Sequence, residues 1–192
     1  MKYLKKTTWL PVLCLALSSS VWADDASDAI EKAATLYKEG QTQQAITQLE
    51  LATQLIRQQR AEAMQQVLPE PLDGWTAEAA TSTSAGAAML GGGSTIKRTY
   101  SKADKNLSIE IVADSPMIQG MMAIFSNPMF GAASQGGKVQ MVNGQQAILK
   151  DDGLMMVVEN TFMVQINADK GMEADVIAYA SAIDLKKLSG FK

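Results

Sequence analysis

A proline-free stretch, residues 24–67, determines how the first part of the chain can fold. Alanine, leucine, glutamine, glutamate and lysine dominate it, and these residue types favour helix. Its one glycine, Gly40, interrupts the helical pattern. Pro69 and Pro71 end the pattern, because a proline disfavours the α conformation of the residue before it. The stretch therefore predicts two helices that are joined near Gly40 and end at about Val67.

Apolar residues recur at spacings of three and four in both predicted helices, as in helices with one packed face. The residues on this face are Ala29, Ala33, Leu36, Tyr37, Ala45, Ile46, Leu49, Ala52, Leu55 and Ile56. We expect residues 24–67 to form an antiparallel helical hairpin that packs on the following domain or on a second copy of the protein. The second helix is rich in glutamine, which suits either solvent or contact with another helix.

The first 23 residues have the three parts of a secretory signal peptide. A basic start is followed by an apolar centre at residues 8–17 and by a small-x-small cleavage site that ends at Ala23. The apolar centre is about half as long as the ~20 residues of a membrane-spanning helix. We therefore expect cleavage after Ala23, a periplasmic location, and no integral membrane span in the mature chain.

Two residue types needed for much of enzyme chemistry are missing from the mature chain. There is no histidine, and the one cysteine, Cys14, belongs to the signal peptide. No Ser-His-Asp or Cys-His arrangement can form, and the commonest zinc and copper ligand is absent. After Ala23 the chain has 14 basic and 20 acidic residues, a net charge of −6 that disfavours nucleic acid as a partner. We expect no metal, no cofactor and no enzymatic activity.

A hydrolase that uses two carboxylates stays open as an alternative. Such an enzyme needs two carboxyl groups that converge across a cleft at ~5–9.5 Å. Asp151 and Asp152 are adjacent in a predicted turn, where neighbouring side chains point apart into solvent. Glu110 and Asp114 alternate along a predicted strand, and we expect Lys97 or Arg98 on the neighbouring strand to pair with them.

From Thr95 onward the apolar period changes to two, which is typical of strands with one buried face. Short connections between these strands favour an antiparallel sheet. Residues 68–192 are therefore predicted to form an α+β domain, an antiparallel sheet with helices packed on one face. Trp75 opens its first strand, and a flexible loop covers about residues 79–94. The predicted strands are 95–101, 107–114, 138–142, 145–150, 154–158 and 162–167, and the predicted helices begin at Ser115-Pro116 and cover 173–188.

Six positions of the helical hairpin match the apolar positions and the turn glycine of one tetratricopeptide unit: Ala33, Leu36, Gly40, Ala45, Leu49 and Ala52. The hairpin resembles a single unit of this kind. Because ~3 repeats are needed for a peptide-binding groove, one copy implies no such groove. Residues 68–188 resemble small sheet-plus-helix domains of uncharacterised Gram-negative periplasmic proteins. The segments 114–117 and 126–129 strengthen this resemblance. That resemblance implies no catalytic residues.

Residues 115–137 contain no charged side chain and are rich in methionine. Three interpretations compete: a helix packed on the sheet, a face that binds an apolar ligand, lipid or partner protein, and a thioether site for Cu(I). The spacing also fits ordinary core packing, and no histidine or cysteine completes a copper site. The candidate binding residues are Trp75, Met117, Met121, Met122, Phe125, Met129 and Phe130.

These observations predict an exported, non-enzymatic binding or accessory protein of the cell envelope. Its partner would be an envelope protein that recognises the hairpin or the methionine-rich segment. The alternative is a carrier or sensor of a hydrophobic small molecule or lipid that uses residues 117–130. Neither the oligomeric state nor the partner follows from the sequence.

Overall fold

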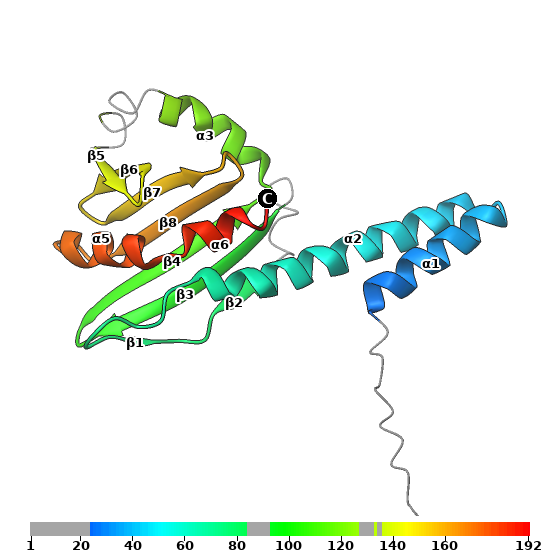
Figure 1. Ribbon diagram of the computed structural model, residues 1–192, viewed down its shortest axis with the longest axis horizontal. Helices are drawn as coiled ribbons and strands as arrows, with labels where there is room; N and C mark the ends of the chain where they lie inside the picture. The colour runs from blue at the N-terminus through cyan, green and yellow to red at the C-terminus, as the bar shows by residue number, and fades with distance from the viewer. Residues whose placement is uncertain (1–23, 84–92, 127–132, 134–135) are drawn as a thin grey trace, which may run out of the picture.

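The computed structural model describes residues 24–83, 93–126, 133 and 136–192. An N-terminal pair of helices is followed by an eight-stranded antiparallel sheet and further helices (Figure 1). The predicted fold class, α+β with an N-terminal helical hairpin, is confirmed. The predicted signal peptide, residues 1–23, lies outside the described residues.

The hairpin consists of helices α1 (Asp25–Lys38) and α2 (Thr42–Met64), and α2 continues into the 3-10 turn η1 (Gln65–Val67). Asp24 caps α1, and its side chain accepts a hydrogen bond from the backbone N–H of Ala26. Gly40 has a φ of +77° in the turn between the helices, a conformation that glycine adopts without strain. The break near Gly40 lies where the sequence predicts it.

The strands follow the alternating apolar pattern closely. They are β1 (Thr76–Ala77), β2 (Thr81–Thr83), β3 (Ser94–Lys102), β4 (Lys105–Ala113), β5 (Lys138–Val142), β6 (Gln145–Lys150), β7 (Gly153–Val158) and β8 (Phe162–Ala168). Their order in the sheet is β1-β3-β4-β8-β7-β6-β5, with β2 also paired to β3. β5 to β8 form the predicted meander, and β8 joins it to β4.

Two segments differ from the prediction. Thr81–Thr83 belong to a strand, because their β-branched residues pair with β3, so this part of the expected loop at about 79–94 is ordered. Residues 84–92 of that loop lie outside the described residues. The predicted helix 173–188 is two helices, α5 (Glu173–Ala182) and α6 (Leu185–Ser189). Asp184 separates them because its side chain caps α6 by accepting a hydrogen bond from the backbone N–H of Lys187.

Both faces of the sheet carry packed apolar residues. On one face, Ile111 and Val164 are buried beneath α5, α6 and the end of α2, together with Met64 and Tyr179. The opposite face holds a smaller cluster of Val112, Met163 and Ile118, the last from α3 (Pro116–Ser126). The sequence analysis predicted that the helices would pack on one face of the sheet. α3 packs on the opposite face, because Val112, Met163 and Val157 are neighbours in register there and form an apolar surface.

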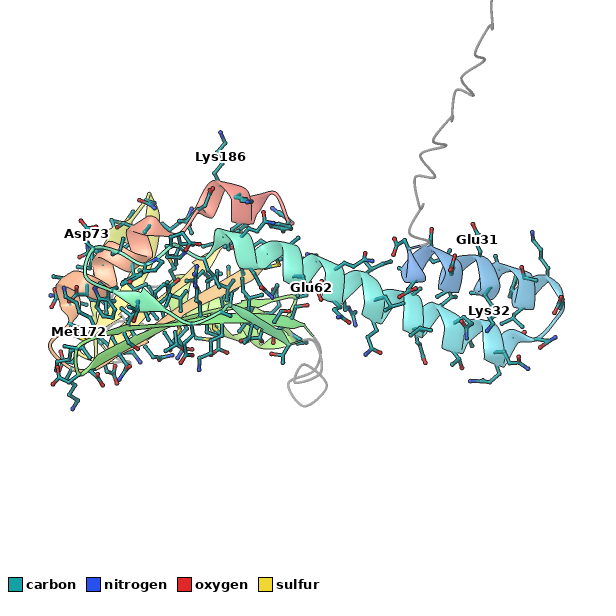
Figure 2. All side chains as sticks on the ribbon, turned by 90° about the horizontal axis from the view of Figure 1, so that it is seen from below. Glu31, Lys32, Glu62, Asp73, Met172 and Lys186 are labelled. Atoms are coloured by element: carbon teal, nitrogen blue, oxygen red, sulfur yellow. The ribbon has the colours of Figure 1, made fainter. Side chains whose placement is uncertain are left out.

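The hairpin projects from the rest of the molecule. Only the C-terminal part of α2 lies beside the sheet, near β2 and β3, whereas α1 and the first part of α2 extend away from it (Figures 1 and 2). α2 therefore joins two environments within one helix. Ala61 and Met64, near its C-terminal end, belong to the core of the α+β domain. Its N-terminal half packs against α1.

Candidate binding surfaces

Small side chains fill the contact between α1 and α2. The fully buried residues there are alanines, which allow two helix backbones to approach closely. Gln59 of α2 donates a hydrogen bond of 2.7 Å to the Asp24 carboxylate, which ties the start of α1 to α2. Leu36 and Leu55 complete the contact and are partly buried. The alanines are Ala26, Ala29, Ala33, Ala45 and Ala52.

Larger apolar residues lie outside this contact. Ile30 and Tyr37 of α1 are 44% and 70% exposed, and Ile46, Leu49 and Ile56 of α2 are 43%, 50% and 47% exposed. The sequence predicted that Tyr37 and the three residues of α2 would lie on the packed face. That prediction is wrong for these four residues, because the alanines occupy the contact and leave the larger neighbours beside it.

The exposed residues lie on one side of the hairpin. Each follows an inward-facing residue by one position, as Ile30 follows Ala29 and Leu49 follows Gln48. One position turns a side chain by about 100° around a helix. Because α1 and α2 run antiparallel, the same rotation on each helix points to the same side of the pair. Ile30, Tyr37, Ile46, Leu49 and Ile56 thus form one surface, named here the hairpin face.

The other side of the hairpin is different in chemistry. Leu51 precedes the buried Ala52 and therefore points to this opposite side, with an exposed fraction of 43%. An open depression of about 410 Å³ lies beside Leu51 and is lined by polar and charged residues as well, among them Asp25, Asp28 and Lys32. The large apolar side chains of the hairpin are thus concentrated on the hairpin face.

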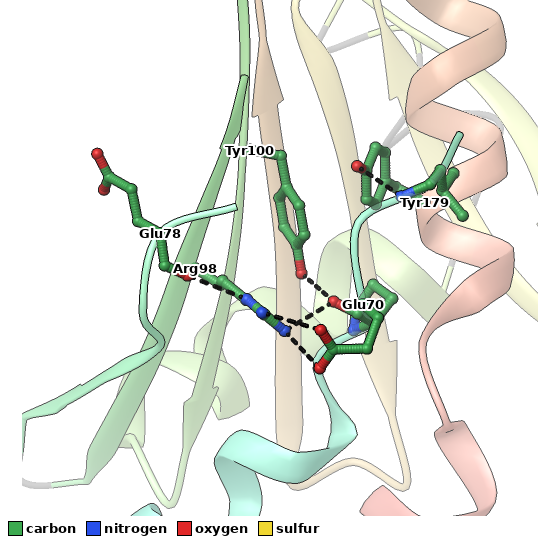
Figure 3. A network of polar contacts seen from close by, with 7 residues as sticks. Glu70, Glu78, Arg98, Tyr100 and Tyr179 are labelled. Carbon is green, nitrogen blue, oxygen red and sulfur yellow. Dashed lines mark hydrogen bonds and ion pairs between the residues drawn. The ribbon is translucent and has the colours of Figure 1, made fainter. Parts of the chain in front are cut away.

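Polar contacts hold the base of the hairpin to the sheet domain. Arg60 of α2 forms an ion pair with Asp114, which follows β4 and has a φ of +57°. After α2 ends, Arg98 of β3 binds the connecting segment (Figure 3). Its guanidinium donates to the backbone oxygens of Pro69 and Glu78 and to both carboxylate oxygens of Glu70.

Two buried tyrosines extend this network. The Tyr100 hydroxyl donates to the Pro69 carbonyl at 2.7 Å, and the Tyr179 hydroxyl accepts from the Leu72 N–H at 3.3 Å (Figure 3). Burial raises the pKa of Tyr100 well above its ordinary value, since the charged form would lose its hydration. The Arg98 guanidinium holds the pKa of Glu70 below its ordinary value. These contacts fix the segment between hairpin and sheet.

The methionine-rich helix α3 is partly packed on the sheet. Ile118 is buried against Val112 and Met163, and Met121 packs at the margin of the same cluster. Met121 and Met122 are both partly buried. Met129 and Phe130 lie outside the described residues, as do the side chains of Met117 and Phe125.

Trp75, the remaining candidate, is a core residue. Its ring meets that of Tyr179 edge to face at 5.3 Å between centroids, and the ammonium of Lys102 lies 5.8 Å from its centroid. Trp75 belongs to the cluster on the α5 face of the sheet, whereas Met121 belongs to the α3 face. The structure therefore does not bring Trp75 together with the methionine-rich helix.

The carboxylates are distributed rather than clustered. Lys97 and Glu110 are neighbours in the strand register, as predicted, but they form no ion pair within the described part of the chain. Asp114, however, pairs with Arg60 from α2, and Arg98 pairs with Glu70, so neither forms the predicted cross-strand contact. Asp151 and Asp152 are exposed in the β6–β7 turn. Among the residues that the structure describes, no group of three or more acidic, histidine or cysteine side chains is placed to hold a metal ion.

The sequence reasoning missed the hairpin face because it counted all apolar residues at helical spacing as one stripe. A finer signal was present: alanines recur at 26, 29, 33, 45 and 52, and the larger residues are offset from them. Small residues at such spacing mark the line of closest helix contact. The larger residues then fall on a second stripe, which lies outside the contact between the two helices and is exposed.

Comparison of the chain with protein-family models, with curated proteins and with solved structures finds no match. Among the described residues, no helix has both the length and the apolar content needed to cross a membrane.

Proposed function

We propose that the protein is an exported, non-enzymatic binding or accessory module of the cell envelope, and that the hairpin face is its binding surface. The observation that carries this proposal is the exposure of Ile30, Tyr37, Ile46, Leu49 and Ile56 on a hairpin that projects from the sheet domain. Their exposed fractions correspond to on the order of 500 Å² of side-chain surface, within the range of the largest apolar patches on monomers, which are often functional.

The separation between the hairpin and the α+β domain supports the same proposal. The α+β domain has its own core and holds the base of α2 through Ala61, Met64 and the Arg60–Asp114 ion pair. The hairpin is thereby presented away from the domain, where a partner can reach both helices. Large apolar side chains on such a projection lower the free energy when a partner removes them from water.

Site-specific photocrosslinking in cells tests this proposal. A photoreactive amino acid replaces Tyr37 on the hairpin face, and the matched control carries it at Leu51 on the opposite side. We expect a discrete crosslinked product from position 37 and none from position 51. Absence of a product from position 37, or equal products from both, would refute the proposal.

Export is tested separately. The mature chain is expected in the periplasmic fraction with Asp24 as its first residue, as determined by N-terminal sequencing. A chain that keeps residues 1–23 would contradict cleavage after Ala23.

A second candidate function is a carrier or sensor of an apolar small molecule or lipid. Its support is the α3 face of the sheet, where Val139 and Met141 of the edge strand β5 are exposed. Val139, Ile148 and Met155 are register partners and continue this face towards α3. Native mass spectrometry of protein purified from the periplasm tests it. A co-purifying lipid that a Met141→Lys variant loses would support the carrier function, and protein that is always empty would contradict it.

A further inference from the structure

We infer that the partner of the hairpin face is the hairpin face of a second copy, so that two hairpins pair into a four-helix bundle. The inference rests on the proposed function, because it names the partner of the same surface. Three features of the hairpin carry it: a second heptad stripe on each helix, a charge pattern that is self-complementary, and the area of the face.

The first feature is the spacing of the exposed residues. On α2 the inward stripe includes Ala45, Gln48, Ala52 and Leu55, at steps of three and four. The exposed stripe repeats the same steps one position later, at Thr42, Ile46, Leu49, Thr53 and Ile56. A helix with two adjacent heptad stripes can pack against two neighbours, as helices do in a bundle. α1 occupies the first stripe and leaves the second for another helix.

α1 carries the corresponding second stripe. It consists of Ser27, Ile30, Ala34 and Tyr37, again at steps of three and four. None of the residues in the two exposed stripes is charged. Charged residues are depleted at the centres of protein interfaces, and a membrane surface would instead attract a face rich in lysine and arginine. An uncharged apolar stripe on both helices therefore favours another helical pair.

The second feature is the charge at the rim of the face. Each helix has an acidic residue and, seven positions later, a basic residue: Glu31 and Lys38 on α1, Glu50 and Arg57 on α2. Each of the four directly follows a residue of the hairpin face, which places it at the outer edge. Figure 2 shows Glu31 at this edge, pointing away from α2.

The order of charges on α2 suits a two-fold partner. None of these four side chains takes part in an ion pair within the described part of the chain. Two copies of α2 that meet antiparallel about a two-fold axis bring Glu50 of one copy towards Arg57 of the other, and the reverse. Interfaces of two-fold dimers are self-complementary in this way. A parallel arrangement would instead place like charges side by side.

The third feature is area. The five residues of the hairpin face expose on the order of 500 Å², more than half of the ~800 Å² that one partner buries in an interface of standard size. Ser27, Ala34, Thr42 and Thr53 belong to the same two stripes and add to the contact. The face is therefore large enough to form the centre of a dimer without a contribution from the sheet domain.

Analytical ultracentrifugation of the mature chain tests the inference. We expect a reversible dimer, and Leu49→Glu should raise its dissociation constant at least tenfold. The matched control is Leu51→Glu, which adds the same charge at similar exposure on the opposite side of the hairpin and should leave the dimer intact. Because Leu49 is half exposed, Leu49→Glu should keep the circular dichroism spectrum of the wild type. Tyr37→Glu, on the other helix, provides a second dissociating variant.

A charge exchange tests the two-fold arrangement. Glu50→Lys should weaken the dimer, and the double variant Glu50→Lys with Arg57→Glu should restore it. A mature chain that stays monomeric at its highest soluble concentration would overturn the inference. So would a dimer that responds equally to substitution of Leu49 and Leu51. If the product crosslinked from Tyr37 has a mass other than that of two chains, the inference fails while the proposed binding function stands.

Discussion

Tyr100 offers a test of how the segment between hairpin and sheet is held. Its hydroxyl is buried and donates to the Pro69 carbonyl at 2.7 Å, an oxygen that also accepts from Arg98. Tyr100→Phe removes the hydroxyl and leaves the carbonyl with one partner. We expect a loss of about 1 kcal/mol in the free energy of unfolding at pH 8, the usual net value of one such hydrogen bond. The midpoint of thermal unfolding should fall by about 2–4 °C.

The pH dependence makes this test sharper. Burial raises the pKa of Tyr100 in the folded protein above the value of about 10 that a tyrosine has when unfolded. The stabilisation is complete below pH 10 and is lost as the pH rises towards the folded pKa, since the unfolded chain releases the proton first. Each pH unit above 10 costs the wild type about 1.4 kcal/mol relative to the phenylalanine variant. The variant should therefore become the more stable protein above about pH 11.

Urea unfolding at pH 8, 10 and 11, followed by circular dichroism, measures this difference. Tyr37→Phe is the matched control at pH 8, where the exposed Tyr37 hydroxyl forms no hydrogen bond within the described residues and the substitution should have little effect. A free-energy difference between wild type and Tyr100→Phe that stays constant from pH 8 to 11 would refute the reasoning. It would mean that Tyr100 ionises in the folded protein as readily as in the unfolded chain.

Four further substitutions test the fold. Gly153→Ala would press a methyl group against the backbone oxygen of Ile166 in β8, so unfolding studies should show a loss of at least about 2 kcal/mol. Gly120→Ala, in helix α3 with open space around it, should instead gain about 0.5–1 kcal/mol. Ala52→Leu should lower the free energy of unfolding by about 1–3 kcal/mol, because it forces α1 and α2 apart. Ala63→Leu, at an exposed position of the same helix, should have little effect. Equal effects of the two substitutions in thermal unfolding would contradict the close contact at Ala52. Arg98→Ala should cost about 2 kcal/mol and raise hydrogen exchange in residues 69–78, and unchanged exchange there would show that Arg98 does not hold this segment.

Local signals in the sequence predicted most of the strands and helices. The turn at Asn143-Gly144 is an example: both residues have positive φ, which asparagine and glycine tolerate. Ser115-Pro116 predicted the start of α3 for a similarly local reason, because proline suits the first turn of a helix. Such residues act on their own backbone, so their effect does not depend on the rest of the fold.

Contacts between distant segments were harder to predict. Nothing in β4 or β8 alone indicates that they pair across nearly fifty intervening residues. The position of α3 had a weak signal, since Val112 and Met163 are apolar on a face where alternation predicts polar residues. Apolar residues on both faces of a strand indicate that both faces are covered.

The exposed stripe of the hairpin was not predicted. The sequence proposed the hairpin as a surface that could recognise a partner, but periodicity alone did not separate the stripe that faces α1 from the stripe one residue further around. Residue size separates them, because alanines such as Ala33 mark the closest approach and Ile30 lies beside it. Trp75, a candidate binding residue in the sequence, lies in the core.

The continuity of α2 has a mechanical consequence. Its 23 residues contain neither glycine nor proline, so it spans about 35 Å as a stiff rod. One end lies away from the sheet domain, and the other end is embedded in the core at Met64. A force on the far end of the hairpin would therefore act as a torque on its base, where Arg60 and Arg98 bind the sheet domain and the connecting segment.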